Sequence, residues 1–321
     1  MRNTRIVYFG TPEFAASQLE AILATGYDVA AVVTMPDKPA GRGQKIQFSE
    51  VKKKALEHKL PLLQPEKLRD PHFLEQLASF DADLFIVVAF RMLPSVVWQM
   101  PRLGTFNLHA SLLPQYRGAA PINFAIINGE TETGLTTFFL NEEIDKGAVI
   151  MREKWPIRPD ETAGDLHDEL MLLGNKVVVE TIKKIEDGNV QALEQNELSK
   201  GEALKPAPKI SREFCRIEWS KDLKSVYNHI RGLSPYPAAH TKLVSAEGNT
   251  IEMKVFATEM ETCQSDLGIG TVVTDNKKFL KVALLDGFLH LTEVQQAGKK
   301  RMVVADFLRG TQLQGTWKAD F

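Results

Sequence analysis

The stretch that most restricts the fold is Leu84–Phe90, LFIVVAF, which is apolar at every position. A strand with one face in water alternates apolar and polar residues, whereas an unbroken apolar run is typical of a strand buried on both faces. Such strands occur in parallel sheets that helices cover on both sides. The run therefore predicts an α/β fold with a central, mostly parallel sheet.

The segments on either side of this run alternate between strand-like and helix-like patterns, as a doubly wound sheet requires. Strands are expected at 5–10, 28–34, 83–90, 104–109, 134–140 and 149–155. Helices are expected at 14–23, 49–58, 68–79, 120–128 and 162–187. The sequence thus predicts a Rossmann-like domain with a doubly wound sheet over residues 1–188.

The rest of the chain has a different pattern. Residues 189–208 lack an apolar period and are rich in proline near their end, so they are expected to form a linker. A helix is expected over 223–231, and short strand-like runs follow at 239–244, 250–260, 270–274, 279–285 and 288–295. Short strands at this spacing predict a small OB-like β-barrel domain over 209–321.

Composition excludes several classes of protein. The 321 residues are 44% hydrophobic and 25% charged, as in an ordinary globular protein. No apolar run reaches the ~18–20 residues of a membrane helix, and no secretory signal is evident, so a cytoplasmic protein is expected. Cys215 and Cys263 lack CxxC spacing, and no histidine lies in an HExxH motif; reduced thiols and no metal are expected.

Charge is unevenly distributed along the chain. Residues 205–321 hold 17 Lys and Arg against 13 Asp and Glu, whereas the first 204 residues hold 22 against 28. A basic C-terminal part beside an acidic N-terminal part is a weak indication of a polyanionic partner.

Three polar residues form the best candidate for a reactive site. Asn107 and His109 are two positions apart on one expected strand, so their side chains should project from the same face. Asp145 follows a second strand, before Gly147. An amide can stabilise an oxyanion, an imidazole can move a proton, and a carboxylate can orient the imidazole. Together they suit transfer of an acyl group to an amine.

The same residues also have a purely structural interpretation. His109 could be a satisfied core histidine, Asn107 a strand-end cap and Asp145 a turn residue, and spacing alone leaves both readings open. The surrounding glycines and prolines favour a pocket, because such residues allow tight turns around a cavity: Pro114, Gly118, Gly134 and Gly147.

Residues 107–118, NLHASLLPQYRG, and 134–150, which contain Asp145-Lys-Gly147, resemble the two signatures of the folate-dependent formyltransferases. Within this family the resemblance is greatest to members that formylate methionine charged on initiator tRNA, and it covers essentially the whole chain. It implies transfer of a formyl group from 10-formyltetrahydrofolate to the amino group of that methionine, for translation initiation. It also implies a Rossmann-like formyltransferase core followed by an OB-like domain that binds tRNA.

The resemblance implies a role for each matched residue. Asn107 would hold the formyl oxygen, His109 would act as acid and base, and Asp145 would position His109 and a water. Folate would be contacted by Ser111, Leu112, Leu113 and Pro114 and by a pterin slot of Val88, Phe90, Arg91, Leu93, Leu140 and Ile144. Phe90-Arg91 stands where other members often have Tyr-Gly, so the rim of the slot is expected to differ in charge.

Basic residues on a glycine-containing loop are the first candidates for contact with tRNA, and Arg42 leads because a guanidinium can grip a phosphate or stack on a base. Lys52 to Lys54 are expected to form a solvated helix face. The predicted tRNA-binding set is Lys38, Arg42, Lys45, Lys209, Lys299 and Lys300.

Two other functions could account for the same sequence features. One keeps the chemistry and changes the acceptor to a sugar-nucleotide amine, which the basic loop at 38–45 argues against. The other is a non-catalytic RNA-binding protein, which would have no need of Asn107, His109 and Asp145. Whether the acceptor is charged tRNA or a sugar nucleotide, the enzyme is expected to be a monomer.

Overall fold

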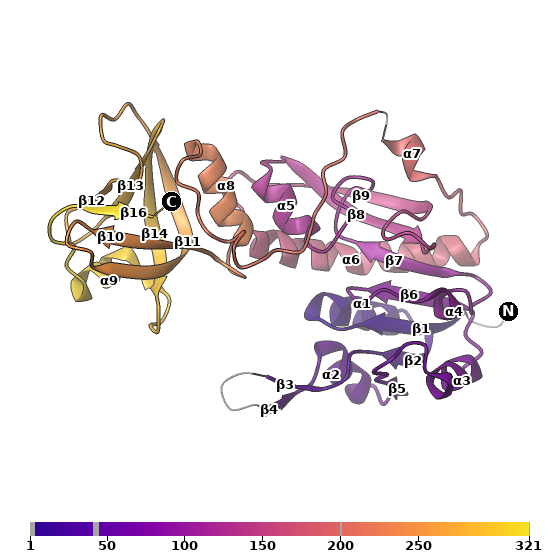
Figure 1. Ribbon diagram of the computed structural model, residues 1–321. Helices are drawn as coiled ribbons and strands as arrows, with labels where there is room; N and C mark the ends of the chain where they lie inside the picture. The colour runs from indigo at the N-terminus through magenta and orange to yellow at the C-terminus, as the bar shows by residue number, and fades with distance from the viewer. Residues whose placement is uncertain (1–3, 41–44, 200, 321) are drawn as a thin grey trace. The chain divides into compact units, whose positions relative to one another are not determined.

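The computed structural model describes residues 4–40, 45–199 and 201–320 (Figure 1). By their contacts these form two compact units that interleave along the chain. The first unit contains residues up to 118, then 133–156 and 167–206, and the second contains 119–132, 157–166 and 207 onward. The predicted division at residues 188 and 209 remains a prediction.

The first unit is built on a seven-stranded, mostly parallel sheet, so the predicted fold class is confirmed. Its strands in spatial order are β5 (Leu62–Leu63), β2 (Asp28–Val33), β1 (Arg5–Gly10), β6 (Leu84–Val88), β7 (Thr105–His109), β8 (Glu132–Phe139) and β9 (Val149–Pro156). Strand β8 runs antiparallel to β7. All five residues of β6 are buried, as its apolar sequence predicted.

Helices cover both faces of this sheet. Alternate residues of β1, β2 and β6 form one apolar cluster with side chains of α3 (Pro71–Ser79) and α4 (Ser95–Trp98). On the opposite face, Tyr8 of β1 donates a hydrogen bond to the carbonyl of Ala15 in α1 (Glu13–Ala24), at 2.6 Å. Alternation of strand side chains explains why neighbours along β1 serve different helices.

Local chemistry sets where the helices begin. The side chains of Ser49 and Asp70 accept hydrogen bonds from backbone N–H groups in the first turns of α2 (Glu50–Glu57) and α3, at 3.0 Å each. Such N-caps satisfy donors that the helix itself leaves unpaired. Between β2 and α2, the two short strands β3 (Lys38–Ala40) and β4 (Lys45–Gln47) form an antiparallel pair that the sequence did not predict.

The second unit contains a nearly closed antiparallel sheet, as expected for an OB-like domain. The path of strands is β12 (Val272–Thr274), β13 (Leu280–Leu284), β14 (Gly287–Gln296), β11 (Thr250–Thr262), β10 (Ala239–Ser245) and β16 (Trp317–Ala319). The amide of Ala319 donates to the carbonyl of Gly270 at 2.8 Å, which brings the two ends of this path together. Strand β15 (Met302–Val303) pairs with β14.

Helices α5 (Pro121–Ile127), α8 (Leu223–Leu233) and α9 (Val304–Gly310) complete the second unit. The fully buried Trp219 lies in its core, and the indole N–H donates to the hydroxyl of Thr241 at 2.9 Å. Helix α9 and strands β15 and β16 were not predicted.

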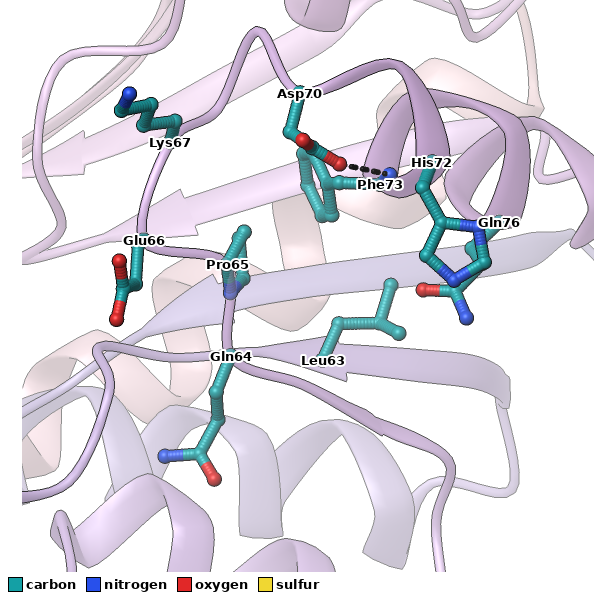
Figure 2. Close-up of a pocket in the computed structure, with 9 residues that line it drawn as sticks. All are labelled: Leu63, Gln64, Pro65, Glu66, Lys67, Asp70, His72, Phe73 and Gln76. Carbon is teal, nitrogen blue, oxygen red and sulfur yellow. Dashed lines mark hydrogen bonds between the residues drawn. The ribbon is translucent and has the colours of Figure 1, made fainter.

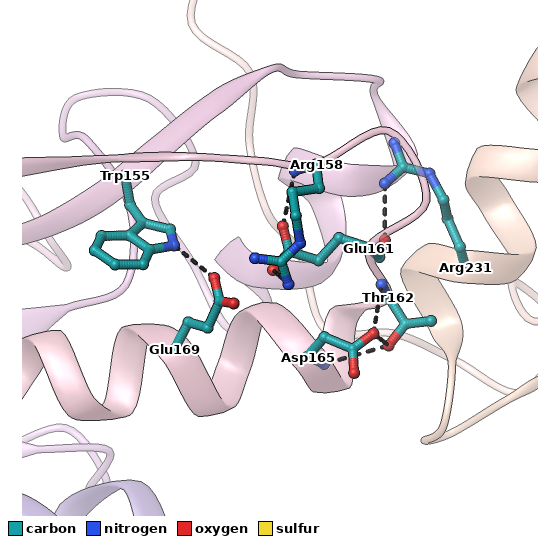
Figure 3. Close-up of polar contacts among 7 residues, drawn as sticks. All are labelled: Trp155, Arg158, Glu161, Thr162, Asp165, Glu169 and Arg231. Carbon is teal, nitrogen blue, oxygen red and sulfur yellow. Dashed lines mark hydrogen bonds and ion pairs between the residues drawn. The ribbon is translucent and has the colours of Figure 1, made fainter.

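Helix α6 (Ala163–Glu186) begins with a reciprocal cap (Figure 3). The Thr162 amide donates to the Asp165 carboxylate at 3.0 Å, and the Asp165 amide donates to the Thr162 hydroxyl at 3.2 Å. This is the capping-box arrangement with aspartate as the acidic member. Just before it, Arg231 of α8 donates to the carbonyl of Glu161 at 2.8 Å.

The segment predicted to be a linker contains regular structure. Leu193 and Val149 exchange backbone hydrogen bonds of 2.9 and 2.8 Å, which adds an antiparallel bridge beside β9. The short helix α7 (Gln195–Leu198) follows directly. Residues 193–198 are thus fixed to the first unit.

Candidate active site

Asn107 and His109 occupy the third and last positions of β7, at its carboxyl end, where α/β sheets bind their ligands. Asn107 lies between Val87 of β6 and Phe138 of β8 in the sheet register. Its side chain is partly exposed, and its amide has no hydrogen-bond partner among the residues that the structure describes. This amide is available to a ligand.

The imidazole of His109 is 6% exposed and has a defined orientation. Its Nε2 lies 2.9 Å from the carbonyl oxygen of Tyr116. A carbonyl can only accept, so Nε2 carries the proton in this arrangement and Nδ1 keeps its lone pair. Neutral His109 can therefore accept a proton at Nδ1.

Asp145 is connected to His109 through the loop at 116–118. The amide of Gly118 donates to the Asp145 carboxylate at 3.0 Å, two residues after the carbonyl that His109 binds. Within the described ranges no hydrogen bond joins His109 directly to Asp145. Tyr116 and Asp145 both have positive φ, at 60° and 54°, and this loop thereby brings the predicted imidazole and carboxylate into one site.

Arg117, between these two contacts, places a cation in the same loop. Burial lowers the pKa of Arg117, while the charges of Asp145 and Glu143 act in the opposite direction. The guanidinium still remains protonated at neutral pH, because an arginine titrates far above it. The site therefore combines an amide, an imidazole, a carboxylate and a fixed positive charge.

The two segments predicted to form the pterin slot contribute to one apolar cluster. Phe90 and Leu93 from one segment and Leu140 from the other pack on the same apolar cluster, and Val88 is fully buried. Ile144 is 64% exposed. Apolar side chains under a backbone that can offer hydrogen bonds fit a flat heteroaromatic ring. The residues present are thus compatible with a pterin.

Residues 111–114 form a buried support. Ser111 is fully buried and donates its hydroxyl to the carbonyl of Gln115 at 2.7 Å. Leu113 is also fully buried and packs with Phe138 and Val149. Pro114 is buried as well, whereas Leu112 is partly exposed. Of these four side chains, that of Leu112 is the one that offers a ligand an accessible surface.

The side chain of Arg91 explains how the unusual Phe90-Arg91 pair is accommodated. The guanidinium donates to the carbonyls of Glu66, at 2.8 Å, and Pro65. Its Nε is buried without a hydrogen-bond partner in the described part of the chain, and burial lowers the pKa of Arg91. Arg91 therefore ties the slot to the segment that follows β5.

That segment also borders a pocket of about 430 Å³ (Figure 2). Asp70 caps α3 at its edge by accepting from the Phe73 amide at 3.0 Å. The pocket is lined by Leu63, Gln64, Pro65, Glu66, Lys67, Asp70, His72, Phe73 and Gln76.

The predicted tRNA-binding residues fall in both units. Lys38 is exposed on β3, and Lys209, Lys299 and Lys300 are exposed in the second unit. Lys45 begins β4, and Arg42 lies outside the described residues.

The expectation of a solvated face at 52–54 is wrong for its first lysine. Lys52 is 9% exposed, because it forms an ion pair with Asp37 and donates to Gln64 at 2.9 Å. Lys53 and Lys54 pair with glutamates at the surface of α2, as a solvated face would.

Sequence reasoning missed Gln195, which is 2% exposed and bonded to both signature segments. The sequence offers no signal that would have found it. In the sequence Gln195 and the exposed Gln191 look alike, since both lie in a polar segment without periodicity.

Comparisons with known proteins connect this arrangement with one family. A family model described as "Formyl transferase" matches residues 4–182, and one described as "Formyl transferase, C-terminal domain" matches residues 209–312. Proteins named "Methionyl-tRNA formyltransferase" are similar over nearly their whole length. The Bacteroides fragilis protein is 55% identical over 98% of both chains, and the Flavobacterium johnsoniae protein 50% over 97% of both.

Solved structures at lower identity share the fold. WlaRD, a sugar 3N-formyl transferase crystallised with dTDP and 5-N-formyl-THF, aligns with a TM-score of 0.65 at 20% identity, over 94% of this chain and all of its own. HypX from Aquifex aeolicus, crystallised with tetrahydrofolic acid, aligns with a TM-score of 0.62 at 19% identity, over 95% of this chain and 47% of its own.

Two kinds of feature are absent from the described residues. Within 4–40, 45–199 and 201–320, no group of three or more His, Cys, Asp or Glu side chains could hold a metal ion. In the same ranges, no helix is both long and apolar enough to cross a membrane.

Proposed function

The chain belongs to the formyl transferase family, and on that premise we propose that it formylates the amino group of methionine charged on initiator tRNA. The formyl donor is 10-formyltetrahydrofolate, and the product serves translation initiation. The observation that supports the proposal most is the loop at 116–118, which binds both His109 and Asp145, with Asn107 two residues before His109 on β7. Relatives that are 50% and 55% identical over nearly the whole chain support the choice of acceptor.

Asn107 and His109 would perform the chemistry at the carbonyl. When the amine attacks the formyl carbon, charge develops on the formyl oxygen, and the free amide of Asn107 would donate a hydrogen bond to it. His109 would accept the amine's proton at Nδ1 and return it to the departing folate nitrogen. The bond from that nitrogen to the formyl carbon breaks, and no covalent enzyme intermediate is needed.

Asp145 would act through orientation and charge. Its carboxylate already accepts the Gly118 amide, which fixes one of its oxygens and leaves the other for a water. A negative group near His109 stabilises the protonated ring and so favours proton transfer from the amine. Arg117 limits the cost of keeping that negative charge in a partly buried site.

The folate would bind with its pterin between 88–93 and 140–144, on the apolar side chains that these segments share. The predicted contacts from Ser111 to Pro114 would come from Leu112 and from backbone groups, since the other three side chains are buried. Bound folate supplies the activated formyl group, and the protein supplies orientation and the donors that stabilise charge.

Transfer RNA would be held by exposed lysines, and the sequence-based prediction adds Arg42 and Lys45 to them. These contacts carry charge and no base-specific pattern, so they would position the tRNA through its phosphates. We expect a cytoplasmic monomer, because initiator tRNA is used there and each chain carries a complete candidate site.

A competition between acceptors tests the proposal. The protein is incubated with 10-formyltetrahydrofolate and equal concentrations of charged initiator tRNA, charged elongator tRNA and a dTDP-amino sugar. Formylation predominantly of the initiator tRNA supports the proposal. Transfer to the sugar amine without transfer to charged tRNA would overturn the acceptor, and binding of tRNA without any transfer would favour an RNA-binding protein.

A further inference from the structure

Gln195 of α7 makes four hydrogen bonds with its buried side-chain amide. Its Nε2 donates to the carbonyls of Asp145, at 2.8 Å, and Gly147, at 2.9 Å. Its Oε1 accepts from Nε and Nη2 of Arg117, at 3.0 and 2.7 Å. An amide has two N–H donors and an oxygen with two lone pairs, so every position of this side chain is used.

These bonds hold the backbone that presents the Asp145 carboxylate. Asp145 has a φ of 54°, a conformation that residues other than glycine seldom adopt. Its carbonyl and that of Gly147 are both fixed by Gln195, while its carboxylate accepts the Gly118 amide. Where the carboxylate lies therefore depends on Gln195.

Gln195 also gives the Arg117 guanidinium an uncharged acceptor. Without it, two N–H donors of a partly buried cation would lack partners, and of the two carboxylates whose charges act on Arg117, that of Asp145 has the larger effect. An Arg–carboxylate pair is strongly favoured when it can become bidentate. Gln195 thus keeps the carboxylate from being drawn into an ion pair with Arg117.

The position of Gln195 is itself fixed from both sides. The backbone bridge between Leu193 and Val149 precedes it, and Leu198 at the end of α7 packs against Leu113, Phe138 and Val149. A segment with this anchoring holds the amide in place without depending on the loop that the amide supports.

We infer that Gln195 is a positioning residue of the active site, which sets the place of the Asp145 carboxylate relative to His109 through the loop at 116–118. The inference rests on the proposed function. Because Gln195 is buried and acts through the loop, its loss should reduce kcat by about 10- to 100-fold, the range expected for a misplaced catalytic group. The KM for 10-formyltetrahydrofolate should stay within about threefold of its normal value, because the pterin slot is unchanged.

The variant Gln195→Met tests this, since methionine is close in size and removes all four bonds. Gln191→Met makes the same chemical change at an exposed position of the same segment and serves as the matched control. Gln195→Glu is the second variant, in case the first fails to fold. It keeps an acceptor for Arg117 and loses both donors to the loop, so it should also lower kcat.

A second readout is independent of the acceptor. Hydrogen exchange at the Gly118 amide reports its bond to the Asp145 carboxylate, and the Leu113 amide, bonded to the Thr136 hydroxyl at 3.1 Å, is an internal control. Exchange at Gly118 should become about tenfold faster in the Gln195 variants, because the opening of that bond becomes easier. Exchange at Leu113 should not change.

The inference requires both results. It is overturned if kcat of the folded Gln195 variants stays within about twofold of the control, or if Gly118 exchange is unchanged. If the wild-type protein transfers no formyl group to any acceptor, the proposed function fails, and the exchange measurement still decides whether Gln195 holds Asp145.

Discussion

Replacing Gly147 with alanine should damage the loop that carries Asp145. A Cβ built on Gly147 would lie 1.6 Å from the carbonyl oxygen of Phe139 and 2.8 Å from its carbonyl carbon. Both atoms belong to the backbone, next to the point where the Phe139 amide donates to the carbonyl of Ala148 at 3.0 Å. Neither can move without breaking the contact between the loop and β8.

The cost can be estimated from this overlap. Moderate overpacking costs about 1–3 kcal/mol, and a contact this short against backbone should reach at least the upper value, about 3 kcal/mol. For a unit of this size each kcal/mol changes Tm by about 2–4 °C, so Tm should fall by roughly 6–12 °C. Formyl transfer should fall further than stability predicts, because Asp145 is two residues away.

Thermal unfolding followed by circular dichroism measures this effect, with activity assayed below the lower Tm. Gly310→Ala is the matched control, since a Cβ there would meet no atom within 4 Å. It adds the same methyl group at the end of α9 and should change stability by less than about 0.5 kcal/mol. A Gly147→Ala protein whose Tm lies within about 2 °C of the control would refute the reasoning.

Three further changes give separate tests. Arg91→Gly removes the hydrogen bonds to the segment after β5. It should raise the KM for 10-formyltetrahydrofolate by about 3- to 10-fold with little change in kcat, and an unchanged KM would contradict a role of Arg91 in the pterin slot. Replacing Lys209, Lys299 and Lys300 with glutamate should weaken tRNA binding, measured by filter binding across salt concentrations. The slope of log K against log salt should become smaller in magnitude by about one for each phosphate that is no longer bound, and an unchanged slope would exclude these lysines as phosphate contacts. Burial lowers the pKa of His229 from 6.5 to about 4. As pH falls from 6.5 to 4, the unfolded chain therefore protonates this histidine while the folded protein does not, and the stability that is present above pH 6.5 is lost over this range. In urea titrations at several pH values, His229→Phe should make the fall in the free energy of unfolding over this range smaller by up to about 3 kcal/mol. An unaltered pH dependence would show that His229 does not cause the fall.

The sequence predicted the parts of the fold that depend on regular patterns. The apolar run at 84–88 became β6, with every residue buried. The two-residue spacing of Asn107 and His109 placed them on one strand at the carboxyl end of the sheet. These features follow from periodicity and strand geometry alone, so they could be predicted without knowing what surrounds them.

What the sequence did not reveal depends on partners that are distant in the chain. Gln195 bonds residues that are 48 to 78 positions away, and no local pattern distinguishes it from a glutamine in an exposed linker. Lys52 is buried for a similar reason, since Asp37 and Gln64 come to it from separate segments. Strand β16 is only three residues long and has too few positions to display a period.

Single-turnover formyl transfer by His109→Ala tests the central claim most directly. The variant, the wild-type protein and a His167→Ala control are each mixed in excess with charged initiator tRNA and 10-formyltetrahydrofolate, and formylmethionyl-tRNA is followed with time. The proposed mechanism predicts rapid transfer by wild type and by the control, and a loss of about 10²- to 10⁴-fold in the variant. Transfer by a folded His109→Ala protein at near the wild-type rate would contradict it.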